Sequence, residues 1–191
     1  MLVFRYDHTF EGLLCAVFDA YSGKGFPEQL VRPGEAEPMF TETVHTVATD
    51  REHAGRVWKG LSRKVPKQVC NALMHCWLSE EPGSDGMIFR YSRKVFDAPR
   101  GIETNFADDD ILQVQKLAMK VSHEGHRVCQ FVRFQKAGDD TYFAAIAPKY
   151  NALPLSCPLY PSDAADEEDS AALCGLLTST HNTYTSLIFI T

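Results

Sequence analysis

The chain has 191 residues, of which 45% are apolar and 11% aromatic, so a single domain of ordinary size with a real core is expected, with or without an appendage. Its apolar runs fall short of the roughly 18 residues that a membrane span needs. The N-terminus lacks the basic region and the small-residue cleavage site of a signal peptide, and we therefore expect a cytoplasmic protein.

The net charge of −6 is unevenly distributed. Five carboxylates lie between Asp163 and Asp169, and no Lys or Arg follows Lys149. Residues 51–100 hold ten Lys and Arg against five Asp and Glu, a net charge of +5. The whole-chain charge argues against a nucleic-acid partner, whereas the local excess of positive charge in residues 51–100 is compatible with nucleic-acid binding.

Helical periodicity predicts most of the chain in order. Asp7 or Thr9 is the expected N-cap of a first helix, and Asp50 caps a second one, because short polar side chains accept hydrogen bonds from the free N–H groups of a first turn. The expected helices span residues 9–21, 51–65, 66–80, 87–97 and 107–127.

Short runs rich in β-branched and aromatic residues predict the strands. Residues 2–7 and 43–49 are two of them, separated by the first helix and a proline-containing loop. Residues 128–135 and 141–147 are expected to pair as a hairpin with Gly138 in its turn. The fold class predicted is α+β, with helices packed on a small, mostly antiparallel sheet and a C-terminal β-hairpin.

The cysteines and glycines predict neither a metal nor a cofactor. The chain has six cysteines but no Cys-x-x-Cys pair, so a zinc ribbon or a redox motif is not expected. Most of the cysteines lie inside apolar helical or strand patterns, where a free thiol behaves as a small buried hydrophobe. Glycine-rich phosphate-binding motifs are absent from the sequence.

Basic residues on the second and fourth helices are the candidates for nucleic-acid contact. Phosphates attract Lys and Arg, and exposed aromatic rings can stack on bases. The competing interpretation is a solvated helix face with its aromatic residues, Trp58 and Trp77 among them, in the core. The candidate residues are Arg56, Lys59, Arg63, Lys64, Arg90 and Arg93.

The stretch HEGHRVCQFVRFQ, residues 123–135, offers a different candidate site. His123 and His126 share a helix face, but no further ligand lies at a metal-binding spacing, and the polar end of a helix explains the pair. A catalytic alternative uses His126 as general acid or base, with Arg127 and Arg133 binding an anionic substrate. Arg133 is expected inside a buried strand, where a guanidinium needs a partner.

Four blocks of sequence resemble a bacterial family called the probable DNA metabolism proteins. The blocks are YDHTFEGLLCAVFDAY, VATDREHAGRVWKGL, NFADDDILQVQKLAMKVSHEGHRVCQFVRFQ and YFAAIAPKYNALPL, and the likeness covers about residues 2–158. The family is typically encoded beside a radical SAM protein of DNA modification or repair, and in some relatives it is fused to a uracil-DNA glycosylase domain. The resemblance supplies no known reaction.

The resemblance implies an accessory protein of DNA repair or modification. Its expected partners are the radical SAM protein, a uracil-DNA glycosylase-like protein and DNA itself. An enzyme using His126 and a protein–protein adaptor that does not contact DNA remain the alternatives.

The likeness stops near residue 158, where relatives continue with an arginine-rich segment. We therefore expect residues 1–158 to form one α+β domain. Residues 159–191 are expected to form a divergent tail that is acidic at first and then rich in Ser and Thr. Such a tail can be ordered or poorly ordered. A change of reading frame near residue 159 is an alternative origin for the tail.

Overall fold

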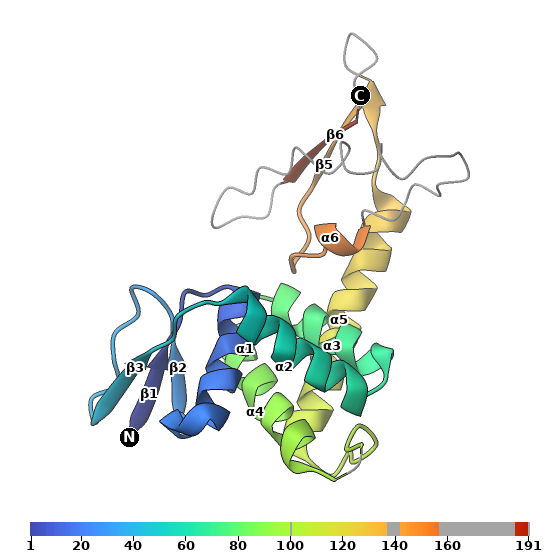
Figure 1. Ribbon diagram of the computed structural model, residues 1–191. Helices are drawn as coiled ribbons and strands as arrows, with labels where there is room; N and C mark the ends of the chain where they lie inside the picture. Colours follow the sequence, from blue (N-terminus) through green and yellow to red (C-terminus); the bar gives the residue numbers. More distant parts are fainter. Residues whose placement is uncertain (100, 137–141, 157–185, 191) are drawn as a thin grey trace. The chain divides into compact units, whose positions relative to one another are not determined.

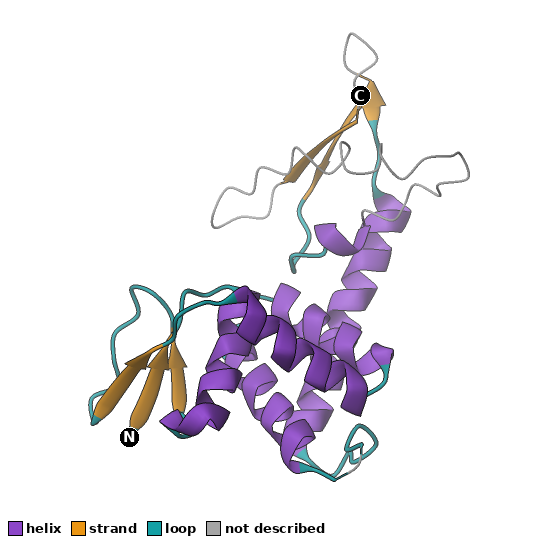
Figure 2. Ribbon diagram, viewed as in Figure 1, coloured by secondary structure: helices purple, strands orange, loops and turns teal. Residues whose placement is uncertain are grey.

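The computed structural model describes residues 1–99, 101–136, 142–156 and 186–190 (Figure 1). The chain divides into two compact units. Unit 1 comprises Met1–Trp77 and Glu81–Leu117, and unit 2 comprises Leu78–Glu80 and the described residues from Ala118 onward. Helices and strands are both present, which confirms the broad α+β class (Figure 2).

A three-stranded parallel sheet lies in unit 1, with β1 (Leu2–Arg5) between β2 (Gln29–Val31) and β3 (Thr43–Thr46). The prediction of a mostly antiparallel sheet is therefore wrong for the sheet of unit 1. The first helix crosses back from the end of β1 to the start of β2, and a loop does the same between β2 and β3, so all three strands run in one direction. β2 lies inside the region predicted as a loop, because three residues between prolines show no strand periodicity.

Both faces of β1 are covered. Phe4 and Tyr6 are buried on the face that meets the helices, where the Phe4 ring lies 4.8 Å from the ring of His45 on β3. Side chains alternate along a strand, so Arg5 faces the other way, and there it pairs with Glu37 of the β2–β3 connection. The sheet is thus placed between helices and a long loop.

The helices of unit 1 lie on one side of this sheet (Figure 1). The first two begin at the caps that the sequence predicts: Thr9 Oγ1 accepts a hydrogen bond from Gly12 N at 2.9 Å, and Asp50 accepts from the N–H groups of Glu52 and His53. The fourth begins at Ser84, three residues before the predicted start at Met87. Their bounds are α1 Phe10–Asp19, followed by a π-turn at Ala20–Lys24, then α2 Arg51–Lys64, α3 Lys67–Leu78 and α4 Ser84–Asp97.

Buried thiols take part in the packing of unit 1. The Cys15 thiol lies against the start of α2 and donates to the carbonyl oxygen of Asp50 at 3.2 Å. The Cys76 thiol on α3 donates to the carbonyl oxygen of Val114 at 3.2 Å. These cysteines behave as the sequence predicts, as small hydrophobes inside the fold.

Helix α5 (Asp109–Phe131) contributes its first turns to unit 1 and the rest to unit 2. The strand predicted over residues 128–135 is wrong except at Gln135, because the helix continues to Phe131 and residues 132–134 form no regular structure. Val121 and Val128, seven positions apart and both buried, keep the helical phase through this segment.

The predicted hairpin is present in shortened form in unit 2. β4 (Gln135–Lys136) pairs antiparallel with β5 (Tyr142–Ile146), and β5 pairs antiparallel with β6 (Ser186–Ile190). The one-turn helix α6 (Leu153–Ser156) follows β5, and Leu155 approaches Gly125 of α5. Gly138 and most of the acidic tail lie outside the described residues. Within the described residues, no helix is both long and apolar enough to cross a membrane.

Candidate functional site

One face of α2 carries three exposed cations. Arg56, Lys59 and Arg63 follow each other at spacings of three and four, so they lie on the same side of the helix. None of the three forms an ion pair with any residue that the structure describes. We call these residues the α2 cation face. Their charge is free to meet an anionic partner.

Aromatic rings support one end of the α2 cation face. The Phe18 ring of α1 stacks on His53, with centroids 4.0 Å apart and an angle of 11° between the planes. The same ring lies 5.3 Å from Arg56 Cζ, at which distance a guanidinium is attracted to an aromatic face. This contact holds the guanidinium of Arg56 beside α1, and the residue as a whole remains exposed to solvent.

Lys64, next to Arg63, has a different environment. Its ammonium donates to the carbonyl oxygens of Val95 at 3.1 Å, Phe96 at 2.7 Å and Ala98 at 3.1 Å. These carbonyls lie at the C-terminal end of α4, where the helix dipole is negative. An ammonium has three N–H donors, so Lys64 is fully used in capping α4.

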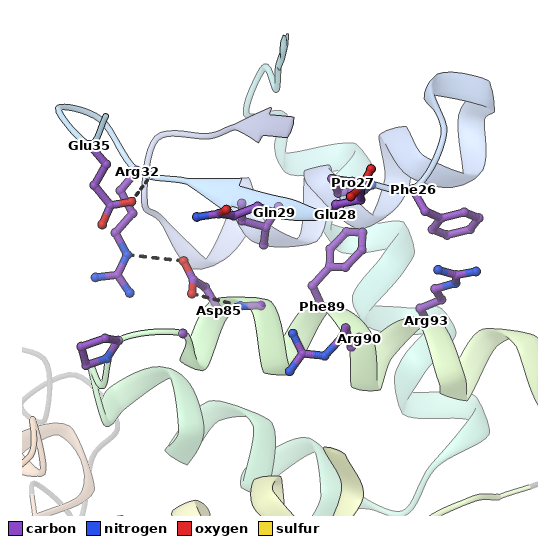
Figure 3. A pocket seen from close by; sticks show the side chains of 14 residues that line it. Phe26, Pro27, Glu28, Gln29, Arg32, Glu35, Asp85, Phe89, Arg90 and Arg93 are labelled. Carbon is purple, nitrogen blue, oxygen red and sulfur yellow. Dashed lines mark hydrogen bonds and ion pairs between the residues drawn. The ribbon is translucent and has the colours of Figure 1, made fainter. Parts of the chain in front are cut away.

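A groove of about 650 Å³ separates β2 from α4 (Figure 3). Arg32, at the end of β2, and Arg90 and Arg93, on α4, line it. Each guanidinium meets a carboxylate through its Nε atom, which leaves the two terminal amino groups for other contacts. The Nε–oxygen distances are 3.4 Å from Arg32 to Asp85, 2.9 Å from Arg90 to Asp110 and 3.5 Å from Arg93 to Asp97.

A buried carboxylate fixes one end of the groove. Asp85 accepts a hydrogen bond from the Tyr6 hydroxyl at 2.9 Å and one from Gly86 N at 3.0 Å, and Arg32 lies against the same carboxylate (Figure 3). Burial and the charge of Asp85 raise the pKa of Tyr6, so its hydroxyl stays protonated and keeps donating. Tyr6 and Asp85 thereby position Arg32 at the groove.

An aromatic contact fixes the other end. The Arg93 guanidinium lies over the Phe26 ring, with Cζ 3.9 Å from the ring centroid. The Tyr21 ring meets the edge of Phe26 at 5.1 Å, and its hydroxyl donates to Asp97 at 2.6 Å. Phe89 is buried between the two ends. Both ends of the groove are therefore tied to side chains of α4.

A second charged cluster joins α4 to the start of α5 within unit 1. Lys94 Nζ lies 2.6 Å from Asp108 Oδ1 and 2.7 Å from Asp110 Oδ2. Hydrogen bonding from Lys94 lowers the pKa of Asp108. Desolvation acts to raise the pKa of Asp110, but hydrogen bonds from Lys94 and Arg90 outweigh it and lower that pKa. Likewise, desolvation is outweighed by the hydrogen bonds to both carboxylates, so the pKa of Lys94 is raised.

The histidine and arginines of the enzymatic alternative lie in unit 2. His126 and Arg127 are exposed on α5, and Arg127 Nη1 donates to Glu124 at 3.4 Å. Arg133 is exposed just beyond α5, which corrects the expectation that it lies in a buried strand; its Nη1 donates to the carbonyl oxygen of Val132 at 3.4 Å. None of the three lines the β2–α4 groove. Among the described residues, no group of three His, Cys, Asp or Glu side chains could hold a metal ion.

The sequence-based search missed the buried end of the groove. Arg32 lies in the predicted loop, and its partner Asp85 is 53 residues away, so no local pattern joins them. A signal was present on α4, where Gly86, Arg90 and Arg93 recur at spacings of four and three. That spacing places them on one helix face, and the absence of a large side chain at Gly86 leaves room beside Arg90.

Comparison with known proteins gives one partial match. A family described as a domain of unknown function, DUF4130, matches residues 82–168. No curated protein matches the chain significantly, and no solved structure does. The matched segment includes α4 and α5, whereas the α2 cation face and strand β2 precede it.

Proposed function

We propose that the chain is an accessory protein of DNA repair or modification, which acts with a radical SAM partner and contacts nucleic acid. The contact surface is the α2 cation face of Arg56, Lys59 and Arg63. The resemblance of four sequence blocks to the probable DNA metabolism proteins supports the biological setting. The observation that carries the contact is that all three cations are exposed and unpaired among the described residues.

Exposed and unpaired cations suit a phosphate backbone. Arg56 and Arg63 are seven positions apart, which is about 10 Å along a helix axis. At about 3.4 Å of rise per nucleotide in one strand of a duplex, the face spans about three phosphates. Neutralising these phosphates releases counterions, so the binding depends on salt.

The other cations proposed from the sequence are less suited to phosphates. Lys64 already uses its three donors on carbonyl oxygens. Arg90 and Arg93 are each bound to a carboxylate through Nε, which neutralises part of their charge, whereas the α2 cation face has no ion-pair partner among the described residues. We therefore narrow the proposed nucleic-acid contact to α2.

Binding of labelled single-stranded and duplex DNA at several salt concentrations tests this proposal. The variant Arg56→Gln/Lys59→Gln/Arg63→Gln should bind at least tenfold more weakly at low salt. The slope of log affinity against log salt should fall by about 2 for single strands or about 3 for duplex, since each phosphate contact contributes about 0.7 or 0.9.

The matched control removes three exposed cations elsewhere in unit 1, in the variant Lys24→Gln/Lys67→Gln/Lys116→Gln. It changes the net charge by the same amount as the α2 variant. Because its three lysines lie outside the α2 cation face, it should keep the wild-type salt slope. Equal losses in both variants would show that only net charge matters and would reject α2 as the contact surface. Absence of binding at low salt, with and without the radical SAM partner, would contradict DNA contact altogether.

Co-purification with the radical SAM partner tests the accessory role. A stable complex that forms only when DNA is present supports a shared substrate. A complex that forms equally well without DNA, combined with no DNA binding by this chain, favours the adaptor alternative.

A further inference from the structure

The groove between β2 and α4 lies beside an edge of the parallel sheet. In the described sheet, β2 pairs with β1 on one side and has no strand on the other. The free side of an edge strand presents backbone N–H and C=O groups that can pair with another chain. A helix beside such an edge forms a channel in which an extended peptide can add as a further strand.

The length of the groove suits a short extended segment. Its two ends are marked by Asp85 and Arg93, which are eight positions apart on α4 and hence separated by about 12 Å along the helix axis. An extended chain advances about 3.3 Å per residue, so about four residues span this distance. The side chains at the ends are held by Tyr6 and Phe26, as described above.

The charges of the groove are arranged asymmetrically. On the α4 side, Arg90 and Arg93 are 54% and 48% exposed and retain their terminal amino groups. On the β2 side, the carboxylates of Glu28 and Glu35 line the groove, and Glu35 already accepts a hydrogen bond from Arg32 N at 3.0 Å. An occupant whose backbone lies along β2 would direct its carboxylates toward α4, where guanidinium groups form charge-assisted hydrogen bonds.

The middle of the groove is apolar. Phe89 is buried there, and Leu30 of β2 is half-buried. In an extended peptide the side chains alternate, so carboxylates can face α4 while the residues between them meet the apolar surface. A nucleotide backbone has no row of N–H and C=O groups that could pair with the free edge of β2.

We propose that β2 and α4 bind an extended acidic segment of a partner protein, which adds to the sheet beside β2 and places its carboxylates on Arg90 and Arg93. This site is separate from the α2 cation face. It gives unit 1 a protein-binding surface in addition to its nucleic-acid surface, and either can be lost without the other.

The test uses the full chain and a fluorescent peptide of alternating Glu and Val, with acetylated and amidated ends. Fluorescence anisotropy measures the affinity, and amide NMR spectra of the ¹⁵N-labelled protein locate the contact. The peptide should bind and should shift the amide signals of Gln29 and Leu30. A peptide with Lys in place of Glu should bind at least tenfold more weakly, and so should one whose backbone nitrogens are methylated.

The variant Arg90→Gln/Arg93→Gln should lower the affinity for the Glu–Val peptide at least tenfold while its circular dichroism is unchanged. The α2 variant Arg56→Gln/Lys59→Gln/Arg63→Gln should bind the peptide like wild type. Equal binding of the methylated peptide would overturn strand addition, as would an absence of shifts at β2. If a short oligothymidylate binds with the same dependence on Arg90 and Arg93 and the peptide does not, the groove is a nucleic-acid site instead.

Discussion

At the scale of single residues, Lys94 shows how a charge can hold two elements together. Its ammonium lies between Asp108, the residue before α5, and Asp110 in the first turn of α5, while Lys94 itself belongs to α4. Asp108 also accepts hydrogen bonds from the N–H groups of Asp110 and Ile111, so it caps the helix as well as pairing with Lys94. A single side chain thus ties α4 to the first turn of α5.

This cluster predicts an acid-sensitive stability. The pKa values of Asp108 and Asp110 are lowered in the folded state, so their contribution is fully present above the unfolded carboxyl pKa of about 3.9 and is lost as the pH falls through the folded values. The variant Lys94→Met should unfold at lower urea concentration than wild type at pH 7. Its deficit should begin to shrink as the pH falls below about 4, where the unfolded chain takes up protons, and should disappear once the pH has fallen through the lowered pKa values of the two folded carboxylates.

Urea midpoints at several pH values measure this effect. The control is Lys116→Met, at an exposed lysine of unit 1 that forms no ion pair with the part of the chain that the structure describes. The control should follow the wild-type curve. A deficit for Lys94→Met that stays constant from pH 7 to strong acid would show that packing, and not charge, accounts for it.

At the scale of elements, the turn between β1 and α1 depends on a missing side chain. Asp7 accepts hydrogen bonds from Thr9 N at 3.0 Å, Thr9 Oγ1 at 2.7 Å and Thr49 Oγ1 at 2.7 Å. These bonds join the segment after β1 to the segment after β3. A Cβ atom at position 12 would overlap Asp7 Oδ1, so Gly12 is what allows the carboxylate to sit over the first turn of α1.

Two glycine-to-alanine substitutions should therefore have opposite effects on the free energy of unfolding. Gly12→Ala displaces Asp7 and should cost about 1–3 kcal/mol, the range for a lost hydrogen-bonding partner of this kind. Gly55→Ala, in the interior of α2 with open space around it, should stabilise by about 0.5–1 kcal/mol. Chemical denaturation of both variants measures the difference. A neutral Gly12→Ala would mean that the Asp7 bonds contribute little to stability.

The elements also show which parts of the fold local sequence could predict. The starts of α1 and α2 were predictable because Thr9 and Asp50 act within three residues of the groups they cap. The direction of the sheet was not, because β1 pairs in parallel with β2 and with β3, and both partners are brought beside it only by tertiary packing. The end of α5 was misplaced because the aromatic and β-branched residues after Arg127 are as typical of a strand as of a helix.

At the scale of the whole molecule, the charge is divided along the chain. Residues 51–100 have a net charge of +5, while Asp163, Asp166, Glu167, Glu168 and Asp169 bring −5 to a segment that contains no Lys or Arg. An acidic segment within a Debye length of a basic surface makes the electrostatic potential at that surface less positive. A polyanion that approaches the surface is then attracted less strongly. Part of the proposed nucleic-acid affinity is therefore opposed by the same chain.

Replacing these five carboxylates by their amides should strengthen DNA binding a few-fold at about 50 mM salt. The effect should vanish near 1 M salt, where the Debye length is about 3 Å. Binding of labelled DNA over this salt range measures it, with five Ser or Thr residues of the same tail changed to Ala as control. An effect that persists at high salt would indicate a direct contact and not a long-range field.

The two candidate sites were predictable from sequence to different degrees, because one lies on a single helix and the other lies between two elements. The α2 cation face follows from spacing within one helix, so the sequence proposes Arg56, Lys59 and Arg63, but only the structure separates them from Lys64, whose ammonium caps α4. The groove requires that β2 and α4 meet, and the partners Arg32 and Asp85 are 53 residues apart. Sequence patterns report the elements, whereas a groove between elements depends on how they pack.

The buried thiols of unit 1 provide an internal reporter of its opening. Cys15, Cys70 and Cys76 are buried thiols, and burial raises the pKa of the Cys15 thiol, so little Cys15 thiolate is present at neutral pH. An alkylating reagent can therefore reach these sulfurs only when the packing around them transiently breaks. Mass spectrometry of the modified peptides would then give an opening rate for α1 and for α3 separately, without any introduced probe.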